Sequence, residues 1–274
     1  MGTGIQLIGH VTWEARMAIM NAEKVLYLVV EGAVKEWIKE LNPKAESLFS
    51  SYGEGRPRID TYLEMTERIL QYVRQGLQVC VVFYGHPGVF VFPSHEAIRI
   101  ARREGYDARM LPGISAEDCM FADLGIDPGR GGCQSFEATD FIAFNRKFDP
   151  RSHLILWQVG LIGDLEYKRN GYDRHGLHVL TEVLREYYAS DHEVVVYEAS
   201  PYLICKPTII PVELSSLPEA RITPISSLYV PPSGESRPDN DRLIRLGIDG
   251  TKLHVVKPCW EIGDKRHLVA DNVS

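Results

Sequence analysis

The sequence predicts an α/β fold with a parallel-sheet N-terminal domain and a smaller C-terminal domain built on a mixed sheet. Strand and helix patterns alternate through the first half of the chain, which is typical of a parallel sheet with helices on both faces. The second half contains several strand patterns and one clear helical pattern. From Pro231 onward the composition turns to Pro, Gly, Ser, Asp and Arg, which indicates the end of the compact body. We therefore expect domains at 1–125 and 126–232 and a C-terminal extension at 233–274.

The elements follow from hydrophobic patterns and from the residues that end them. The clearest strand is 77–84, because five of its eight residues are β-branched or aromatic. Pro93 opens the helix after it and Gly105 ends that helix, while Ser115 and Asp118 predict a cap for the next one. In the first domain the expected helices are 13–23, 33–41, 57–75, 93–103 and 115–124, and the expected strands are 25–30, 77–84 and 106–111. In the second, strands are expected at 135–144, 153–159, 193–199 and 222–230, with a helix at 177–188.

Composition excludes several classes of protein. With 274 residues, 45% hydrophobic and 24% charged, the chain is typical of globular proteins. A net charge of −7 argues against nucleic acid as a partner, and no apolar run approaches the roughly 20 residues that a membrane helix needs. Five scattered cysteines without a C-x-x-C favour a reducing cytoplasm, and His175 and His178 lack the further ligands that a metal site requires.

Two glycine-containing turns follow predicted strands. In the run Tyr84–Phe90, two glycines can take positive φ and Pro87 stiffens the turn, while Pro112-Gly113 forms the second turn. In open α/β sheets, ligands bind beyond the carboxyl ends of strands, where helix N-termini favour anions. The two turns can face one crevice or be ordinary βα loops, and spacing alone leaves both interpretations open.

The runs 84–90 and 112–117 resemble the S-adenosylmethionine loops of the tetrapyrrole methylase superfamily. More closely, the chain resembles the borosin peptide-backbone N-methyltransferases, particularly the split kind, whose substrate is a separate precursor peptide. The resemblance runs from Gly2 to about Leu253 and includes the runs 58–62, 124–129, 134–138, 156–158 and 224–226. It implies a tetrapyrrole-methylase-like fold.

The resemblance also implies S-adenosylmethionine as cofactor and S-adenosylhomocysteine as product. The cofactor contacts that it implies are Tyr84, His86, Val89, Phe90, Ser115, Ala116, Gln158 and, more weakly, Ala199. Many tetrapyrrole methylases have Gly-Asp-Pro where this chain has Gly85-His86-Pro87. A histidine in such a turn can also serve simply to cap the backbone.

Methylation of an amide nitrogen requires chemical help, because the nitrogen lone pair is delocalised into the carbonyl. A catalyst must weaken the N–H bond, stabilise charge on the carbonyl oxygen and align the methyl donor. Tyr52, Arg58 and Tyr62 supply suitable groups, and they match the catalytic Tyr, Arg and Tyr of the borosin enzymes in spacing. By that resemblance Tyr62 is the proton acceptor, Arg58 tunes it, and Tyr52 donates to the substrate carbonyl.

Two structural alternatives stay open at this point. If Pro57 opens the helix, Arg58 and Tyr62 share one helix face, whereas a capping box of Thr61 and Glu64 would leave Arg58 in the loop. Tyr62 also fits the apolar stripe of an ordinary amphipathic helix together with Met65.

Three functions compete. The leading hypothesis is N-methylation of backbone amides in a separate precursor peptide by a homodimer. The alternatives are a methylase of a corrinoid or another small molecule, and a non-catalytic domain that binds the cofactor. Tyr52, Arg58 and Tyr62 argue for the first, because the trio is not expected in tetrapyrrole methylases.

Both ends of the chain bear on these expectations. Relatives begin with a strand that leads into a Gly-x-Gly turn, whereas Met1 stands directly before Gly2-Thr3-Gly4, so either the start lies upstream or that strand is lacking. Residues 251–274 carry a solvated mixture of charges, so we expect that they are not a substrate and that truncation after Gly250 preserves activity.

Overall fold

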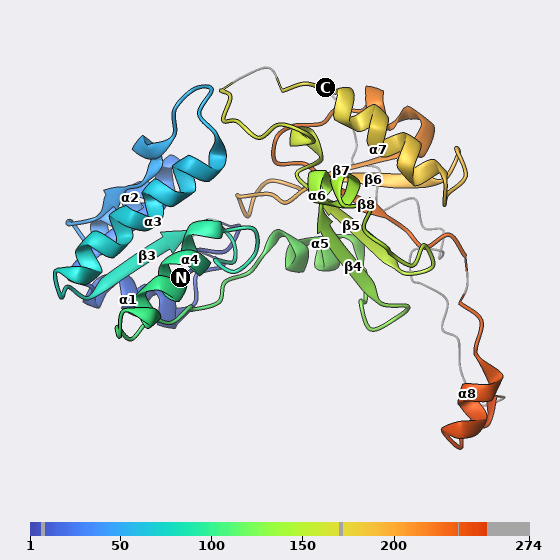
Figure 1. Ribbon diagram of the computed structural model, residues 1–274, viewed down its shortest axis with the longest axis horizontal. Helices are drawn as coiled ribbons and strands as arrows, with labels where there is room; N and C mark the ends of the chain where they lie inside the picture. Colours follow the sequence, from blue (N-terminus) through green and yellow to red (C-terminus); the bar gives the residue numbers. More distant parts are fainter. Residues whose placement is uncertain (7–8, 170–171, 235, 251–274) are drawn as a thin grey trace. The chain divides into compact units, whose positions relative to one another are not determined.

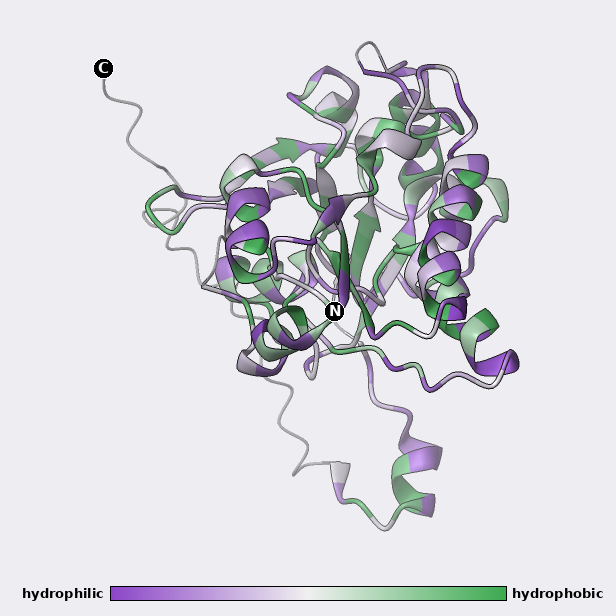
Figure 2. Ribbon diagram, turned by 90° about the vertical axis from the view of Figure 1, so that its left-hand side faces the viewer, coloured by the Kyte–Doolittle hydropathy of each residue, from purple (hydrophilic) through white to green (hydrophobic). Residues whose placement is uncertain are grey.

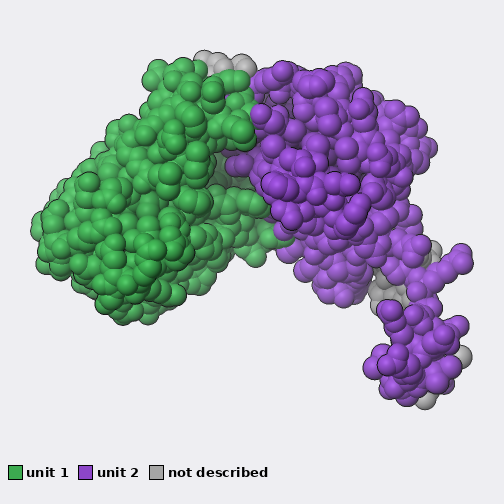
Figure 3. All heavy atoms as spheres, viewed as in Figure 1, with its two compact units in different colours: residues 1–119, 164–171, 199–206 green, residues 120–163, 172–198, 207–274 purple. Residues whose placement is uncertain are grey.

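The computed structural model describes residues 1–6, 9–169, 172–234 and 236–250 (Figure 1). The expectation for residues 251–274 lies outside this range. The chain divides into two compact units, coloured separately in Figure 3. Unit 1 consists of 1–119, 164–171 and 199–206, and unit 2 consists of 120–163, 172–198 and 207–274. Two short segments from the second half of the sequence thus belong to unit 1, whereas the domain limits 1–125, 126–232 and 233–274 remain a prediction.

Unit 1 is built on a parallel three-stranded sheet of order β2-β1-β3, in which Leu26 of β1 stands opposite Val81 of β3. The strands are β1 (Lys24–Leu28), β2 (Glu46–Ser47) and β3 (Val79–Phe83). The helices are α1 (Trp13–Asn21), α2 (Gly32–Leu41), α3 (Arg58–Arg74), α4 (Phe92–Arg103) and α5 (Ala116–Leu124), whose last residues belong to unit 2.

Alternation along the strands gives the sheet of unit 1 two apolar faces. Val25 and Val82 pack with residues of α1 and α2, whereas Leu26 and Phe83 pack with residues of α3 and α4. The helices of unit 1 show hydrophobic and hydrophilic stripes in Figure 2, as expected for helices that cover a sheet. The carboxyl ends of β1 and β3 consequently lie along one edge of a covered parallel sheet.

Unit 2 contains a mixed five-stranded sheet of order β4-β5-β8-β6-β7. Only β4 and β5 are parallel, and the other neighbours are antiparallel. The strands are β4 (Cys133–Glu137), β5 (His153–Trp157), β6 (Glu193–Glu198), β7 (Thr208–Glu213) and β8 (Ser227–Val230), and the helices are α6 (Ala138–Ala143), α7 (His175–Arg185) and α8 (Asn240–Arg245). Three short 3₁₀ helices complete the described chain at Phe49–Ser51, Val159–Leu161 and Leu214–Glu219. The predicted fold class, a parallel sheet followed by a mixed sheet, is confirmed.

Three predicted strands were wrong in part or in full. Residues 106–111 form no strand, because a cavity lies between them and the edge of β3. The strand expected at 135–144 ends at Glu137, whose carboxylate accepts the Asp140 N–H at 2.7 Å and caps α6. The strand expected at 222–230 begins only at Ser227, because Thr223 and Ser226 form a hydrogen-bonded turn.

Candidate functional site

The predicted catalytic residues lie at the start of α3 and in the loop before it, all within unit 1. Tyr52 follows the 3₁₀ turn Phe49–Ser51, and its backbone N–H bonds to the Phe49 carbonyl at 3.1 Å. Arg58 is the first residue of α3, and Pro57 stands just before it with extended backbone angles. Arg58 and Tyr62 are therefore about one turn apart on a single helix.

The alternative capping box is not formed. Thr61 is buried within α3, and its hydroxyl has no hydrogen-bond partner among the described residues. Glu64 instead pairs with the Arg56 guanidinium at 2.5 Å. Arg58 consequently belongs to the helix and not to the loop before it.

Tyr52 lies in a setting that keeps its phenol protonated. Burial raises the pKa of Tyr52, and its electrostatic and hydrogen-bond interactions with the adjacent Tyr62 raise it further. Arg58 acts in the opposite direction, because a nearby cation favours the phenolate. Since the pKa remains above its ordinary value, Tyr52 is a hydrogen-bond donor at neutral pH.

Tyr62 on α3 makes two kinds of packing contact. Its ring stacks on that of Phe92 at the start of α4, with centroids 6.2 Å apart and planes 25° apart. It also packs against the buried cluster that contains Met65 and Leu26. The apolar stripe predicted for this helix is therefore present, and it orients Tyr62 beside Tyr52.

Arg68 on α3 holds the loop that carries Tyr52 in place through hydrogen bonds. Arg68 donates to the hydroxyls of Ser50 and Ser51 at 3.0 and 3.1 Å, and to the Ser47 carbonyl at 3.1 Å. These bonds hold the chain immediately before Tyr52 against the helix that carries Arg58 and Tyr62.

Glu46 anchors this arrangement from β2. Its carboxylate accepts from Lys24 at 2.7 Å, from Arg68 at 2.6 Å and from the Tyr72 hydroxyl at 2.9 Å. Lys24 is the largest cause that lowers the pKa of Glu46, and Arg68 and Tyr72 add to it against the opposing effect of burial, so the pKa falls to about 2. Tyr72 is therefore part of the hydrogen-bond network around Glu46.

A segment that the sequence analysis missed completes the surroundings of the catalytic loop. Residues 164–169, here called the strap, run antiparallel to the loop before α3. The Tyr167 carbonyl accepts the Gly55 N–H, the Tyr167 N–H bonds to the Arg56 carbonyl, and the Leu165 carbonyl accepts the Arg58 N–H, each at 2.9 Å. No local pattern reveals this pairing, because it joins segments about a hundred residues apart.

Side chains of the strap reach two of the predicted catalytic residues. The Tyr167 ring lies against the Tyr52 ring, with centroids 4.8 Å apart and planes 41° apart. Burial favours the neutral form of Asp164, but Lys168, whose ammonium lies 2.6 Å away, and the charge of Arg58 outweigh it and lower the pKa of the carboxyl. Arg58 thus interacts electrostatically with the Asp164 carboxylate of the strap.

Three glycine-containing turns converge near the carboxyl end of β3. Gly4 and Gly85 exchange two backbone hydrogen bonds, at 3.2 and 3.0 Å. A Cβ atom on Gly2 would lie 2.1 Å from the Gly85 carbonyl oxygen, and one on Gly113 would lie 2.6 Å from the same oxygen. Only glycine fits at Gly2 and Gly113. The two turns predicted from the sequence therefore lie side by side, and the Gly2–Gly4 turn packs against both at Gly85.

In the first predicted cofactor turn, the histidine caps the backbone. His86 Nδ1 accepts the Gly88 N–H at 2.9 Å, and the His86 carbonyl accepts the Val89 N–H at 3.1 Å. Phe90 is half exposed and takes a φ of 54°, which is uncommon for a bulky residue. Burial of the phenol raises the pKa of Tyr84 to about 12.

The second turn contains the cap that the sequence predicts. The Ser115 N–H and hydroxyl both donate to the Asp118 carboxylate at 2.7 Å, and the Asp118 N–H bonds back to the Ser115 oxygen at 3.2 Å. Ser115 is buried, and Ala116 is the first residue of α5. This cap is confirmed, and it places the start of α5 beside the glycine turns.

The other two predicted cofactor contacts, Gln158 and Ala199, follow strands β5 and β6 and do not belong to the glycine turns. Gln158 follows β5 in unit 2 and has a left-handed backbone with a φ of 59°. Ala199 follows β6, and the segment that it opens belongs to unit 1. Their part in binding remains a prediction.

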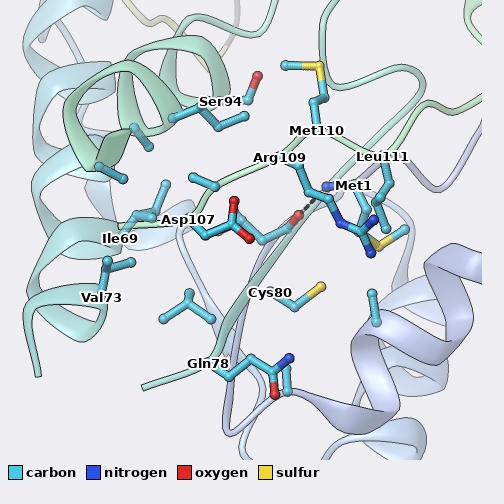
Figure 4. A pocket seen from close by; sticks show the side chains of 18 of the residues that line it. Met1, Ile69, Val73, Gln78, Cys80, Ser94, Asp107, Arg109, Met110 and Leu111 are labelled. Carbon is cyan, nitrogen blue, oxygen red and sulfur yellow. Dashed lines mark hydrogen bonds between the residues drawn. The ribbon is translucent and has the colours of Figure 1, made fainter. Parts of the chain in front are cut away.

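A cavity of about 550 Å³ lies elsewhere in unit 1 (Figure 4). It is lined by Cys80 on β3, by Val73 on α3, by Leu111 and by Met1, whose amino group bonds to the Val81 carbonyl at 2.7 Å. None of the three predicted catalytic residues lines it. The cavity is therefore separate from the predicted catalytic residues.

Within the described residues, none of the helices combines the length and the apolar character needed to cross a membrane.

Comparison with solved structures supports the fold. The crystal structure of uroporphyrin-III-C-methyltransferase from Thermus thermophilus matches with a TM-score of 0.58 and 19% identity, over 85% of this chain and 92% of that chain.

Comparison with curated proteins finds much nearer relatives. A methyltransferase and cyclic peptide precursor for gymnopeptides from Gymnopus fusipes is 44% identical over 90% of this chain and 60% of its own length. The corresponding protein for omphalotin A from Omphalotus olearius is 42% identical over 97% of this chain and 63% of its own length. A type III borosin precursor and methyltransferase from Anomoporia bombycina is 42% identical over 90% of this chain and 29% of its own length. The chain thus spans less than two thirds of the length of these relatives.

The family model for tetrapyrrole (corrin/porphyrin) methylases matches residues 1–201, which is most of the chain. The chain therefore belongs to the tetrapyrrole methylase family, and within it is a homologue of the borosin-type peptide N-methyltransferases.

Proposed function

We propose that this protein uses S-adenosylmethionine to methylate backbone amide nitrogens of a separate, ribosomally made precursor peptide. The observation that carries the proposal is the cluster of Tyr52, Arg58 and Tyr62 at the start of α3. It lies in a homologue of proteins whose names join a methyltransferase to a ribosomally synthesized cyclic peptide precursor. The same cluster has no evident purpose in the methylation of a carbon on a large macrocycle.

The two tyrosines are suited to different steps. Tyr52 stays protonated because burial and Tyr62 raise its pKa, so it donates a hydrogen bond to the substrate carbonyl oxygen, where negative charge grows in the transition state. Tyr62, in its deprotonated form, accepts the amide proton and becomes the phenol, while the amide nitrogen takes the methyl group from the sulfonium of the cofactor. Arg58 supplies positive charge to this pair, and the helix start fixes its position.

The glycine turns are suited to the cofactor. The Gly85 and Gly113 turns pack closely on one another near the carboxyl end of β3, which is where ligands bind in open α/β sheets. We assign binding to Tyr84, His86, Val89, Phe90, Ser115, Ala116, Gln158 and Ala199. The cofactor supplies the methyl group, and the product is S-adenosylhomocysteine.

The separate substrate and a homodimer are part of the same proposal. The relatives carry methyltransferase and precursor in one name, whereas the resemblance of this chain to the split borosin enzymes implies a precursor on a separate chain. A long flexible peptide is held more readily by two subunits than by one. Exposed apolar side chains at Leu203 (83% exposed) and Ile204 (95% exposed) of unit 1 provide surface for such an assembly.

The test is to offer the enzyme, with S-adenosylmethionine, a synthetic peptide that has a Val- and Ile-rich core and, in a parallel reaction, a corrinoid acceptor. Mass spectrometry of both acceptors should show methyl groups on the peptide alone. Methylation of the corrinoid alone would favour the small-molecule methylase, and cofactor binding without transfer to either acceptor would favour a non-catalytic domain.

A further inference from the structure

The strap is fixed to the catalytic loop at several points along its length. Three backbone hydrogen bonds of 2.9 Å join residues 165–167 to residues 55–58, and the Arg169 N–H bonds to the Glu54 carboxylate at 3.0 Å. This pairing places Tyr167 next to the catalytic loop. The Leu165 side chain is 73% exposed, whereas Tyr167 is half-buried against Tyr52.

The Tyr52 ring contacts two other aromatic rings. The centroid of the Phe49 ring lies 5.4 Å from that of Tyr52, and the centroid of the Tyr167 ring lies 4.8 Å from it. Phe49 is itself 45% exposed and belongs to the same short turn as Tyr52. Of these two contacts, only that of Tyr167 comes from a distant part of the chain and is anchored by its own backbone hydrogen bonds.

We propose that Tyr167 is a positioning residue for methyl transfer, whose ring fixes the orientation of the Tyr52 ring. This inference rests on the proposed function, because it gives Tyr52 the task of meeting the substrate carbonyl. A hydrogen-bond donor stabilises the transition state only when it is already aimed at the position of the developing charge. A Tyr52 ring free to turn would spend most of its time in other orientations and would slow the chemical step without weakening cofactor binding.

The ring of Tyr167, not its hydroxyl, carries this role. The described contact is between rings, and no hydrogen bond of the Tyr167 hydroxyl is found in the described part of the chain. The Tyr167→Phe variant should therefore keep the positioning role of this ring, whereas the Tyr167→Leu and Tyr167→Ala variants should lose it. Leucine retains apolar volume but lacks a flat ring, so it separates loss of the ring contact from simple unfolding.

The experiment measures turnover on a separate core peptide for the wild type and for Tyr167→Phe, Tyr167→Leu and Tyr167→Ala. We expect kcat to fall at least about ten-fold in the leucine and alanine variants, with KM and S-adenosylhomocysteine affinity nearly unchanged, because misorientation of a catalytic group is costly. Tyr167→Phe should retain kcat. Thermal melting confirms that each variant compared is folded. Unchanged kcat in folded Tyr167→Leu would overturn the proposal.

A second readout does not depend on activity. Fluorotyrosine placed at position 52 gives a ¹⁹F resonance that reports on the surroundings and titration of that ring. In the leucine and alanine variants the resonance should move towards that of free fluorotyrosine, and its pKa should fall, since burial is the main cause of the high pKa of Tyr52. An unchanged resonance would refute the positioning role. If the resonance responds but the wild type transfers no methyl group, the proposed function is wrong and the structural contact is right.

Discussion

Replacement of Glu46 by glutamine tests whether the polar network beneath the catalytic loop stabilises the fold. The carboxylate holds three partners, and its pKa falls from 4.5 to about 2. That difference corresponds to about 3.4 kcal/mol of stabilisation at neutral pH. Because the side chain is 39% exposed, solvent screening reduces this, and we expect a loss of about 1–2 kcal/mol in Glu46→Gln.

Thermal melting at pH 7 should show this loss as a fall in Tm of about 2–8 °C. The sign of the pH dependence follows from the lowered pKa of Glu46. Its stabilising contribution is complete above pH 4.5 and disappears as the pH falls towards 2, so the melting curves of variant and wild type should converge in acid. Glu36→Gln is the matched control, because Glu36 is 70% exposed and pairs with Lys39 on its own helix, at 3.0 Å. Equal Tm values for wild type and Glu46→Gln at pH 7, or a difference that persists unchanged at pH 2, would refute the reasoning.

Further predictions concern the site. Tyr62→Phe should nearly abolish methyl transfer in a mass-shift assay and leave cofactor affinity unchanged by calorimetry, because it removes one hydroxyl away from the glycine turns; near-normal turnover would exclude Tyr62 as the proton acceptor. Arg58→Lys should also reduce turnover strongly, since an ammonium cannot replace the planar guanidinium. Gly113→Ala should weaken S-adenosylhomocysteine binding, because its Cβ would lie 2.6 Å from the Gly85 carbonyl oxygen; unchanged affinity would show that the turns do not form the cofactor site. Light scattering should show a homodimer, and an active monomer at micromolar concentration would contradict that expectation.

Local patterns predicted most of the helices and strands, because caps and hydrophobic periodicity depend on residues that are close together in the sequence. The start of α3 beside Pro57 and the cap formed by Ser115 and Asp118 were both read from adjacent residues, and both are present in the structure. The strand expected at 106–111 failed because a strand also requires a partner, and a cavity occupies the place beside β3. The hydrophobic pattern of that segment carries no information about its neighbours.

The site was harder to predict than the fold for the same reason. The positions of Tyr52, Arg58 and Tyr62 followed from resemblance and helix spacing. The contact of Tyr167 with Tyr52 joins residues far apart in the sequence, and neither segment has a periodic pattern that predicts the pairing. Such contacts depend on how the chain returns to unit 1 after entering unit 2.

The most direct test of the central claim is to follow a labelled methyl group to its final atom. The full chain is incubated with a separate precursor peptide and S-adenosylmethionine that carries a deuterated methyl group, and both chains are fragmented in the mass spectrometer. We predict that the label lies on backbone nitrogens of the peptide and that Tyr62→Phe leaves the peptide unlabelled. Label found only on residues 251–274 of the enzyme would show that the chain is its own substrate, and label on side chains or on neither chain would contradict the proposed reaction.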